Sequence, residues 1–168
     1  NFQISNAVMA TQFYGRGPGE YGVLGSAMGA GALAAALWAA GRGQARLRFI
    51  LGGMAGYTIF SLVAAFSPRF ELFAALQVPL GLAAATVLVT GNTMVQSSTS
   101  PQMRGRVMAL WGLVIMGVTP LVSPLVGWLG DHLGPQSTVL FGAVCVGIAP
   151  SKTLAKLANH IAKTAERK

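Results

Sequence analysis

The stretch Leu72–Met103, LFAALQVPLGLAAATVLVTGNTMVQSSTSPQM, contains no Asp, Glu, Lys or Arg. Four other long stretches share this property: Tyr21–Ala40, Phe49–Ser67, Val107–Gly130 and His132–Ser151. A helix needs about 20 residues to cross the roughly 30 Å apolar core of a bilayer, so each stretch crosses that core or nearly does. The sequence therefore predicts an all-α integral membrane protein.

Composition supports this class. The chain is 53% hydrophobic and 10% charged, whereas a soluble domain carries about 25% charged residues. The net charge of +8 does not indicate nucleic-acid binding, because the basic residues lie at the ends of apolar stretches rather than in one patch with aromatic side chains. We therefore expect the lipid bilayer to surround the chain, and we expect no nucleic-acid partner.

Apolar stretches and turn residues together predict about five full membrane helices and a partial first one. The expected helices are Asn1–Tyr14 (partial), Tyr21–Ala40, Leu47–Phe66, Glu71–Gln96, Arg106–Gly130 and a short one at 136–150. The expected connections are Gly15–Glu20, Gly41–Arg48, Ser67–Phe70, Ser97–Gly105 and Asp131–Pro135, most of them marked by Pro or Gly.

Basic residues divide unequally between the two sides of the membrane when the connections are assigned alternately. One side receives Arg42, Arg46, Arg48, Arg104, Arg106, Lys152, Lys156, Lys163, Arg167 and Lys168. The other side receives Arg16 and Arg69, which Glu20 and Glu71 balance. Because basic loops stay in the cytoplasm, we expect a multi-pass protein of the plasma membrane with a cytoplasmic C-terminus.

The tail 151–168 differs from the rest in being polar and basic. Leu154, Leu157 and Ile161 recur at helical spacing. Two interpretations stay open: an amphipathic helix on an anionic inner leaflet, or a solvated cytoplasmic tail.

Small and helix-breaking residues recur inside the apolar stretches. The pairs Gly25/Gly29 and Gly52/Gly56 have the four-residue spacing that lets helices approach closely. The candidate hinge residues are Pro79, Gly117, Pro120 and Pro124, since proline removes a helix hydrogen bond and a bundle can use the resulting bend. Irregularity without function is the alternative for these residues.

Polar side chains within the apolar stretches are few, and buried amides and hydroxyls need partners. The expected candidates for a substrate cavity are Gln12, Thr86, Thr90, Asn92 and Gln96. Gln3 and Asn6 are further amides in the first segment. Hydrogen bonding between helices, without a ligand, is the alternative.

Other chemistry is not indicated. His132 and His160 are isolated, so no metal site is expected, and no cofactor motif is present. The sequence contains no nucleophile with a base and a carboxylate beside it, so we expect no enzyme. Cys145 is the single cysteine. No ionisable group lies at mid-membrane depth, so ion coupling is expected to use residues outside this chain.

The segment Asn92–Gly134 carries the most specific pattern: a polar-ended helix, PQMRGRV at 101–107, a helix with spaced Gly and Pro, and a closing GDHLG at 130–134. This segment resembles the C-terminal half of a major facilitator superfamily transporter, in particular the bacterial drug and siderophore efflux branch. The resemblance covers residues 1–150 and implies helices seven to twelve of that fold, with the seventh truncated.

The resemblance also implies a mechanism. Two six-helix halves rock around a central site, so it implies the N-terminal half of the transporter as a partner and a small-molecule substrate. Arg42, Arg104 and Arg106 would lie at the cytoplasmic gate, and the chain would export an amphipathic molecule by alternating access. The alternative is a membrane packing or assembly protein without transport, or an inactive truncated product.

Overall fold

The computed structural model describes residues 2–41 and 45–148, and all regular elements within these ranges are helical. They are α1 (Phe2–Val8), the π-helix η1 (Met9–Phe13), α2 (Pro18–Ala40), α3 (Leu47–Ala65), α4 (Phe70–Ser97), α5 (Arg104–Leu133) and a short last helix, Pro135–Ile148. Within the described ranges, α2, α3, α4 and α5 are long and apolar enough to cross a membrane. The predicted all-α membrane bundle is confirmed, whereas Arg42 and the tail 151–168 lie outside the described residues.

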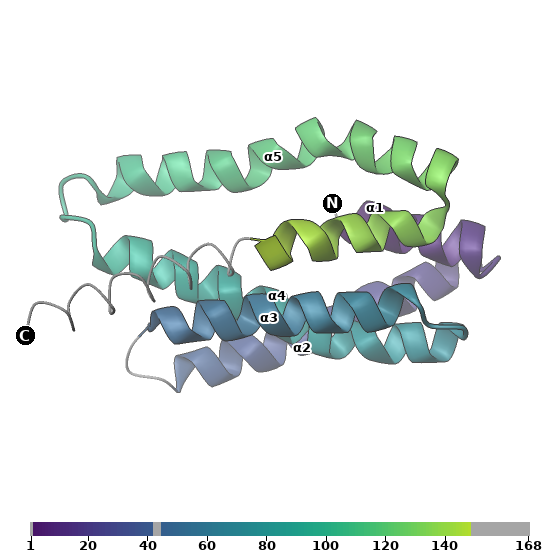
Figure 1. Cartoon of the computed structure of the whole chain (residues 1–168). Helices are drawn as coiled ribbons and strands as arrows, with labels where there is room; N and C mark the ends of the chain where they lie inside the picture. The colour runs from purple at the N-terminus through teal and green to yellow at the C-terminus, as the bar shows by residue number, and fades with distance from the viewer. Residues whose placement is uncertain (1, 42–44, 149–168) are drawn as a thin grey trace, which may run out of the picture.

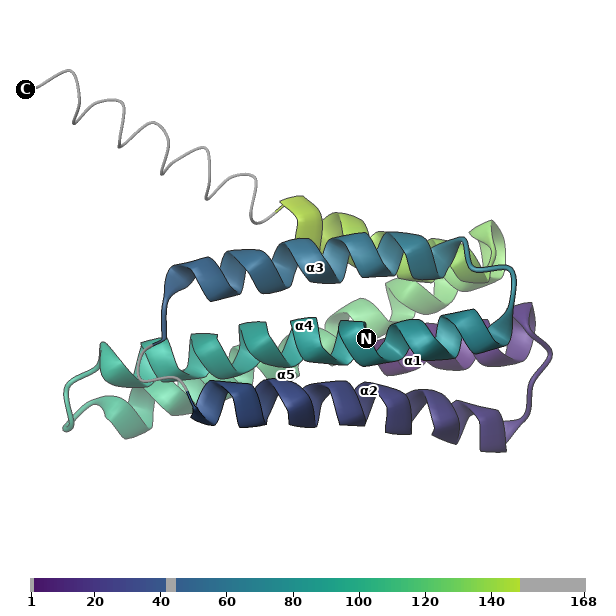
Figure 2. The ribbon, with the colours of Figure 1, turned by 90° about the horizontal axis from the view of Figure 1, so that it is seen from below.

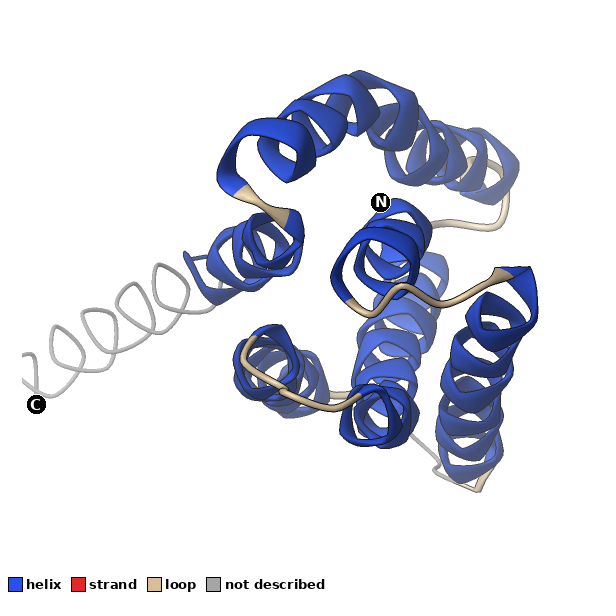
Figure 3. Cartoon of the chain, turned by 90° about the vertical axis from the view of Figure 1, so that its right-hand side faces the viewer, coloured by secondary structure: helices blue, strands red, loops and turns tan. Residues whose placement is uncertain are grey.

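Helix α4 is the centre of the bundle. It lies between α2 and α3 (Figure 2) and packs against both along much of its length. Helix α5 forms the opposite side of the molecule, and α1 and the last helix lie between it and α4 (Figures 1 and 3). Most large side chains of α5 are exposed, among them Leu113, Met116 and Leu121. The core therefore sits around α4, and α5 contributes little to it.

Several predicted boundaries were wrong. Helix α2 begins at Pro18 rather than Tyr21, because proline suits the first helical position and the Gly17 N–H donates to Glu20 Oε2 at 3.2 Å. Helix α5 runs from Arg104 to Leu133, so most of the predicted turn after Gly130 is helical. The actual break is Gly134, whose φ of 86° favours glycine.

Close contact between α2 and α4 depends on two glycines. A Cβ atom on Gly31 would overlap the carbonyl oxygen of Val78, and one on Gly81 would overlap that of Met28. On α3, a Cβ atom on Gly53 would lie 2.7 Å from Val87 Cγ2. These three glycines are at the helix contacts.

The sequence prediction chose the wrong glycines on the right helices. A Cβ atom on Gly25, Gly29 or Gly52 would meet no atom within 4 Å, and one on Gly56 would make only ordinary contact at 3.8 Å. Four-residue spacing was present at these positions, but it does not tell which face of a helix meets its neighbour. Their open faces instead border grooves, as described below.

A polar and aromatic cluster ties the end of η1 to the loops at the same end of the bundle. The Tyr14 hydroxyl donates to the Ser67 carbonyl at 2.7 Å. The Tyr14 ring packs against Phe70 and Phe73 with centroids 5.7 and 5.5 Å away. Arg16 lies 5.3 Å from the Phe70 ring centroid and 3.7 Å from Glu71. The cluster holds η1 against the start of α4.

We expect Gly81→Ala to destabilise the protein by about 1–3 kcal/mol, since the added methyl group must push α2 and α4 apart. Gly29→Ala is the matched control, because its methyl group meets nothing and alanine favours the helix by about 1 kcal/mol. Thermal unfolding of both variants in detergent checks this. Equal midpoints for the two would contradict the proposed contact.

Burial raises the pKa of Tyr14 from 10.0 to about 12. The folded protein therefore favours the neutral phenol, and the stabilisation is complete below pH 10 and is lost as the pH rises through 12. The phenolate absorbance of Tyr14 can be assigned by comparing the protein with Tyr14→Phe, which lacks it. We expect this signal to titrate near pH 12 in the folded protein. A midpoint near 10 would mean that the phenol is not shielded.

Candidate transport site

Two buried amides connect α1 with α4. The Asn6 Nδ2 group donates to Gln77 Oε1 at 3.3 Å, and Gln77 Nε2 donates to the Phe73 carbonyl at 3.3 Å. Gln77 is 0% exposed and Asn6 is 4% exposed. Asn6 Oδ1 is buried and accepts no hydrogen bond within the described part of the chain. One acceptor in an apolar bundle is thus left without a donor, which costs free energy.

Asn6 also lines a groove between α1 and α2. This groove has a volume of about 330 Å³. Its lining residues are Gln3, Asn6, Tyr21, Gly22, Gly25, Met28, Gly29 and Ala32. The small residues of α2 leave the space open, and the two amides of α1 supply hydrogen-bonding groups. The lining includes no charged side chain. Such a groove suits a compact, mostly uncharged molecule with a polar group.

The structure does not gather the predicted cavity residues in one place. Thr86 and Thr90 are buried on α4, and the Thr86 hydroxyl donates to the Leu82 carbonyl at 2.7 Å. Asn92 is half-buried, and its Oδ1 has no partner in the described ranges. Gln12 and Gln96 are exposed. None of these five residues lines the α1–α2 groove, and their role in a cavity stays a prediction.

The predicted gate and hinge residues are also placed. Arg104 and Arg106 lie exposed in the first turn of α5. Pro79 is inside α4, and Gly117, Pro120 and Pro124 are inside α5, which bends along its length in Figure 1. Because α5 is packed loosely, a bend there disturbs few contacts. Gating and hinge motion stay predictions.

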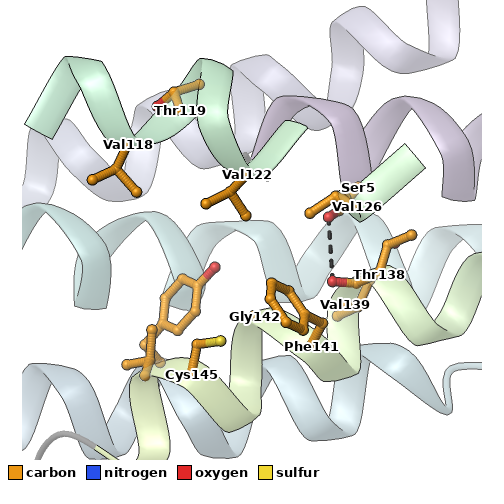
Figure 4. Close-up of a pocket in the computed structure, with 12 residues that line it drawn as sticks. Ser5, Val118, Thr119, Val122, Val126, Thr138, Val139, Phe141, Gly142 and Cys145 are labelled. Carbon is orange, nitrogen blue, oxygen red and sulfur yellow. Dashed lines mark hydrogen bonds between the residues drawn. The ribbon is translucent and has the colours of Figure 1, made fainter. Parts of the chain in front are cut away.

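A second, mainly apolar cavity lies on the other side of α1 and has a volume of about 400 Å³. In Figure 4, Val118 and Val122 of α5 face Phe141 and Cys145 of the last helix. At one end the Ser5 hydroxyl donates to the Thr138 carbonyl at 3.5 Å. The Ser5 and Thr138 hydroxyls already donate to carbonyl groups, whereas Asn6 Oδ1 accepts no hydrogen bond in the described residues. The cavity is therefore a weaker candidate for specific binding than the groove with Asn6.

Sequence reasoning recognised Asn6 as an amide in need of a partner but did not include it among the site candidates, and it missed Gln77. A single polar side chain in the middle of an apolar stretch was the available signal for Gln77. Its partner could not be found from spacing, because the two amides are 71 residues apart.

The helices, the buried amide pair and the uncharged groove define a multi-pass helical membrane protein with a candidate small-molecule site. The Major Facilitator Superfamily family model matches residues 1–158. The chain therefore belongs to the major facilitator superfamily, a family of secondary transporters. Comparisons with curated proteins and with solved structures found no match. The matched range ends inside the basic tail predicted at 151–168.

We expect Gln77→Leu to destabilise the protein by about 0.5–2 kcal/mol, because it leaves Asn6 with no hydrogen-bond partner. The double variant Asn6→Leu/Gln77→Leu should recover part of this loss, since no buried amide then remains. Thermal unfolding of these variants in detergent measures the double-mutant cycle. Gln12→Leu, at an exposed position, is the control. Additive effects of the two single changes would show that the pair is not coupled.

Proposed function

We propose that the chain is the second half of a bacterial exporter that moves amphipathic small molecules out of the cell by alternating access. The single observation that carries this proposal is the uncharged groove between α1 and α2, which is lined by Asn6, a residue whose buried Oδ1 accepts no hydrogen bond in the described residues. Rotation of the Asn6 side chain would turn Oδ1 toward the groove, where a ligand hydroxyl or N–H group can supply that donor in exchange for the hydrogen bond to Gln77. The apolar part of the ligand then lies against Met28 and the α2 glycines.

Position within the family fold supports the same site. The resemblance implies that the first and fourth helices of this half, Asn1–Tyr14 and Glu71–Gln96, line the central pathway, and α1 in the first of them carries both Gln3 and Asn6. The open face of α2 can then face the other half of the transporter, which would supply the second wall of the pathway. In this proposal the basic loops and the C-terminus are cytoplasmic, the membrane is the bacterial inner membrane, and an ion gradient drives export through residues outside this chain.

The test is dye export from bacteria that lack their own dye exporters and produce this protein, with ethidium and rhodamine 6G as probes. Gly25→Leu should lower export about tenfold, because the new side chain extends into the groove from a position where an added Cβ atom meets nothing within 4 Å. Gly112→Leu on α5 is the matched control, since an added Cβ atom on Gly112 also meets nothing within 4 Å. Equal export by both variants would overturn the assignment of this groove.

Cysteine labelling separates transport from simple membrane packing. In a Cys145→Ser background, cysteines at Ala32, Thr86, Thr90 and Asn92 should react with aqueous thiol reagents if a water-filled pathway reaches them, and one at Val87 should not. A probe dye should protect Ala32→Cys. Silence at all positions would favour a membrane packing protein without a pathway.

A further inference from the structure

A groove lined by residues of α2, α3 and α4 has a volume of about 390 Å³. Its lining residues are Trp38, Arg48, Phe49, Gly52, Gly53, Gly56, Phe60, Pro79, Leu82, Ala83 and Thr86. The glycines of α3 provide the space, since a Cβ atom on Gly52 would meet nothing within 4 Å. Apart from Arg48 at one end and the Thr86 hydroxyl, the lining is apolar.

Positive charge is concentrated at the Arg48 end. Arg46 is the N-cap residue of α3, makes no side-chain cap hydrogen bond, and is exposed, as is Arg48. The first turn of α3 contains no acidic residue. A helix N-terminus is itself the positive end of the helix dipole, so two arginines there are unfavourable until an anion binds. No acidic side chain lines the groove.

Aromatic side chains mark the same end. Trp38 and Phe49 make an edge-to-face contact with centroids 5.6 Å apart, and the Arg48 guanidinium lies 5.0 Å from the Phe49 ring centroid. Tryptophan concentrates at the level of lipid headgroups. Trp38 at 52% exposure is therefore placed to contact lipid where the hydrocarbon meets the headgroups.

The length of the groove decides which kind of ligand its apolar part can hold. From Arg48 to Phe60 the groove follows α3 for about 18 Å, at 1.5 Å per residue. Half of the roughly 30 Å apolar core of a bilayer is about 15 Å, the depth that one acyl chain covers. A compact solute would leave most of this groove empty, whereas one lipid chain fills it from end to end.

We propose that this groove binds an anionic phospholipid, with its phosphate at Arg48 and Arg46 beside the start of α3 and one acyl chain along Gly52, Gly56 and Phe60. Bound lipid would neutralise the start of α3 and cover the open face at Gly52, where an added Cβ atom would meet nothing within 4 Å. This groove shares no lining residue with the α1–α2 groove, and Thr86 is the one predicted cavity residue that lines it.

The test measures thermal unfolding of the whole chain in a neutral detergent, titrated with phosphatidylglycerol or with phosphatidylcholine of the same acyl chains. Phosphatidylglycerol should raise the midpoint in a saturable way, and phosphatidylcholine should raise it much less. Arg48→Gln should increase the half-saturating phosphatidylglycerol concentration about fivefold, the effect of one interfacial arginine. Arg106→Gln removes the same charge from another helix start and should leave it unchanged.

Two further measurements separate the headgroup from the chain. Gly52→Leu fills the groove and should abolish saturable stabilisation, whereas Gly112→Leu on α5 should not. Inorganic phosphate alone should give no shift. Equal loss in Arg48→Gln and Arg106→Gln, an equal response to both lipids, or full stabilisation by phosphate would each overturn the proposal.

Discussion

The close approach of α2 and α4 at Gly31 and Gly81 is the contact on which the rest of the bundle depends. Lipid tails are as apolar as leucine, so helices in a bilayer are not driven together by the hydrophobic effect and rely on close packing and polar contacts. Two glycines that each meet the backbone of the facing helix give the closest packing that helices can reach. Helix α4 is thereby fixed, and the remaining helices are placed relative to it.

Attachment to α4 becomes weaker from one helix to the next. Helix α3 packs along it through Gly53, and α1 is held by the Asn6–Gln77 hydrogen bond and the Tyr14 cluster. Helix α5 contributes two fully buried positions, Val126 and Gly130, within the described residues. Elements with few buried contacts open at lower free-energy cost. In the proposed transport cycle, α5 would therefore be the element that moves at the lowest cost, while α2 and α4 stay fixed.

The class and the spans could be predicted from the sequence because charge is excluded from hydrocarbon at every residue, so the signal accumulates over each stretch. Helix ends are predicted less accurately: Pro18 belongs to the predicted turn Gly15–Glu20, but it starts α2, because proline also suits the first position of a helix. The glycine contacts and the Gln77 partner could not be predicted, because both depend on which face of one helix meets another. Which residues form the site depends on which faces of the helices meet, and a single sequence predicts these faces poorly.

Glycine therefore serves two opposite purposes in this bundle, and the atoms that face each glycine decide which one. The missing side chain of Gly31 lets the backbone of α4 come close. At Gly25 and Gly52 the missing side chain leaves open space, since no described protein atom lies within 4 Å of an added Cβ atom. Leaving such faces bare forgoes dispersion contacts that a leucine could make. An unpaired amide oxygen beside one bare face adds a cost of about 1–3 kcal/mol. In the proposed site these two costs lie side by side on α1 and α2, and a ligand that filled the space and donated to Asn6 would recover both.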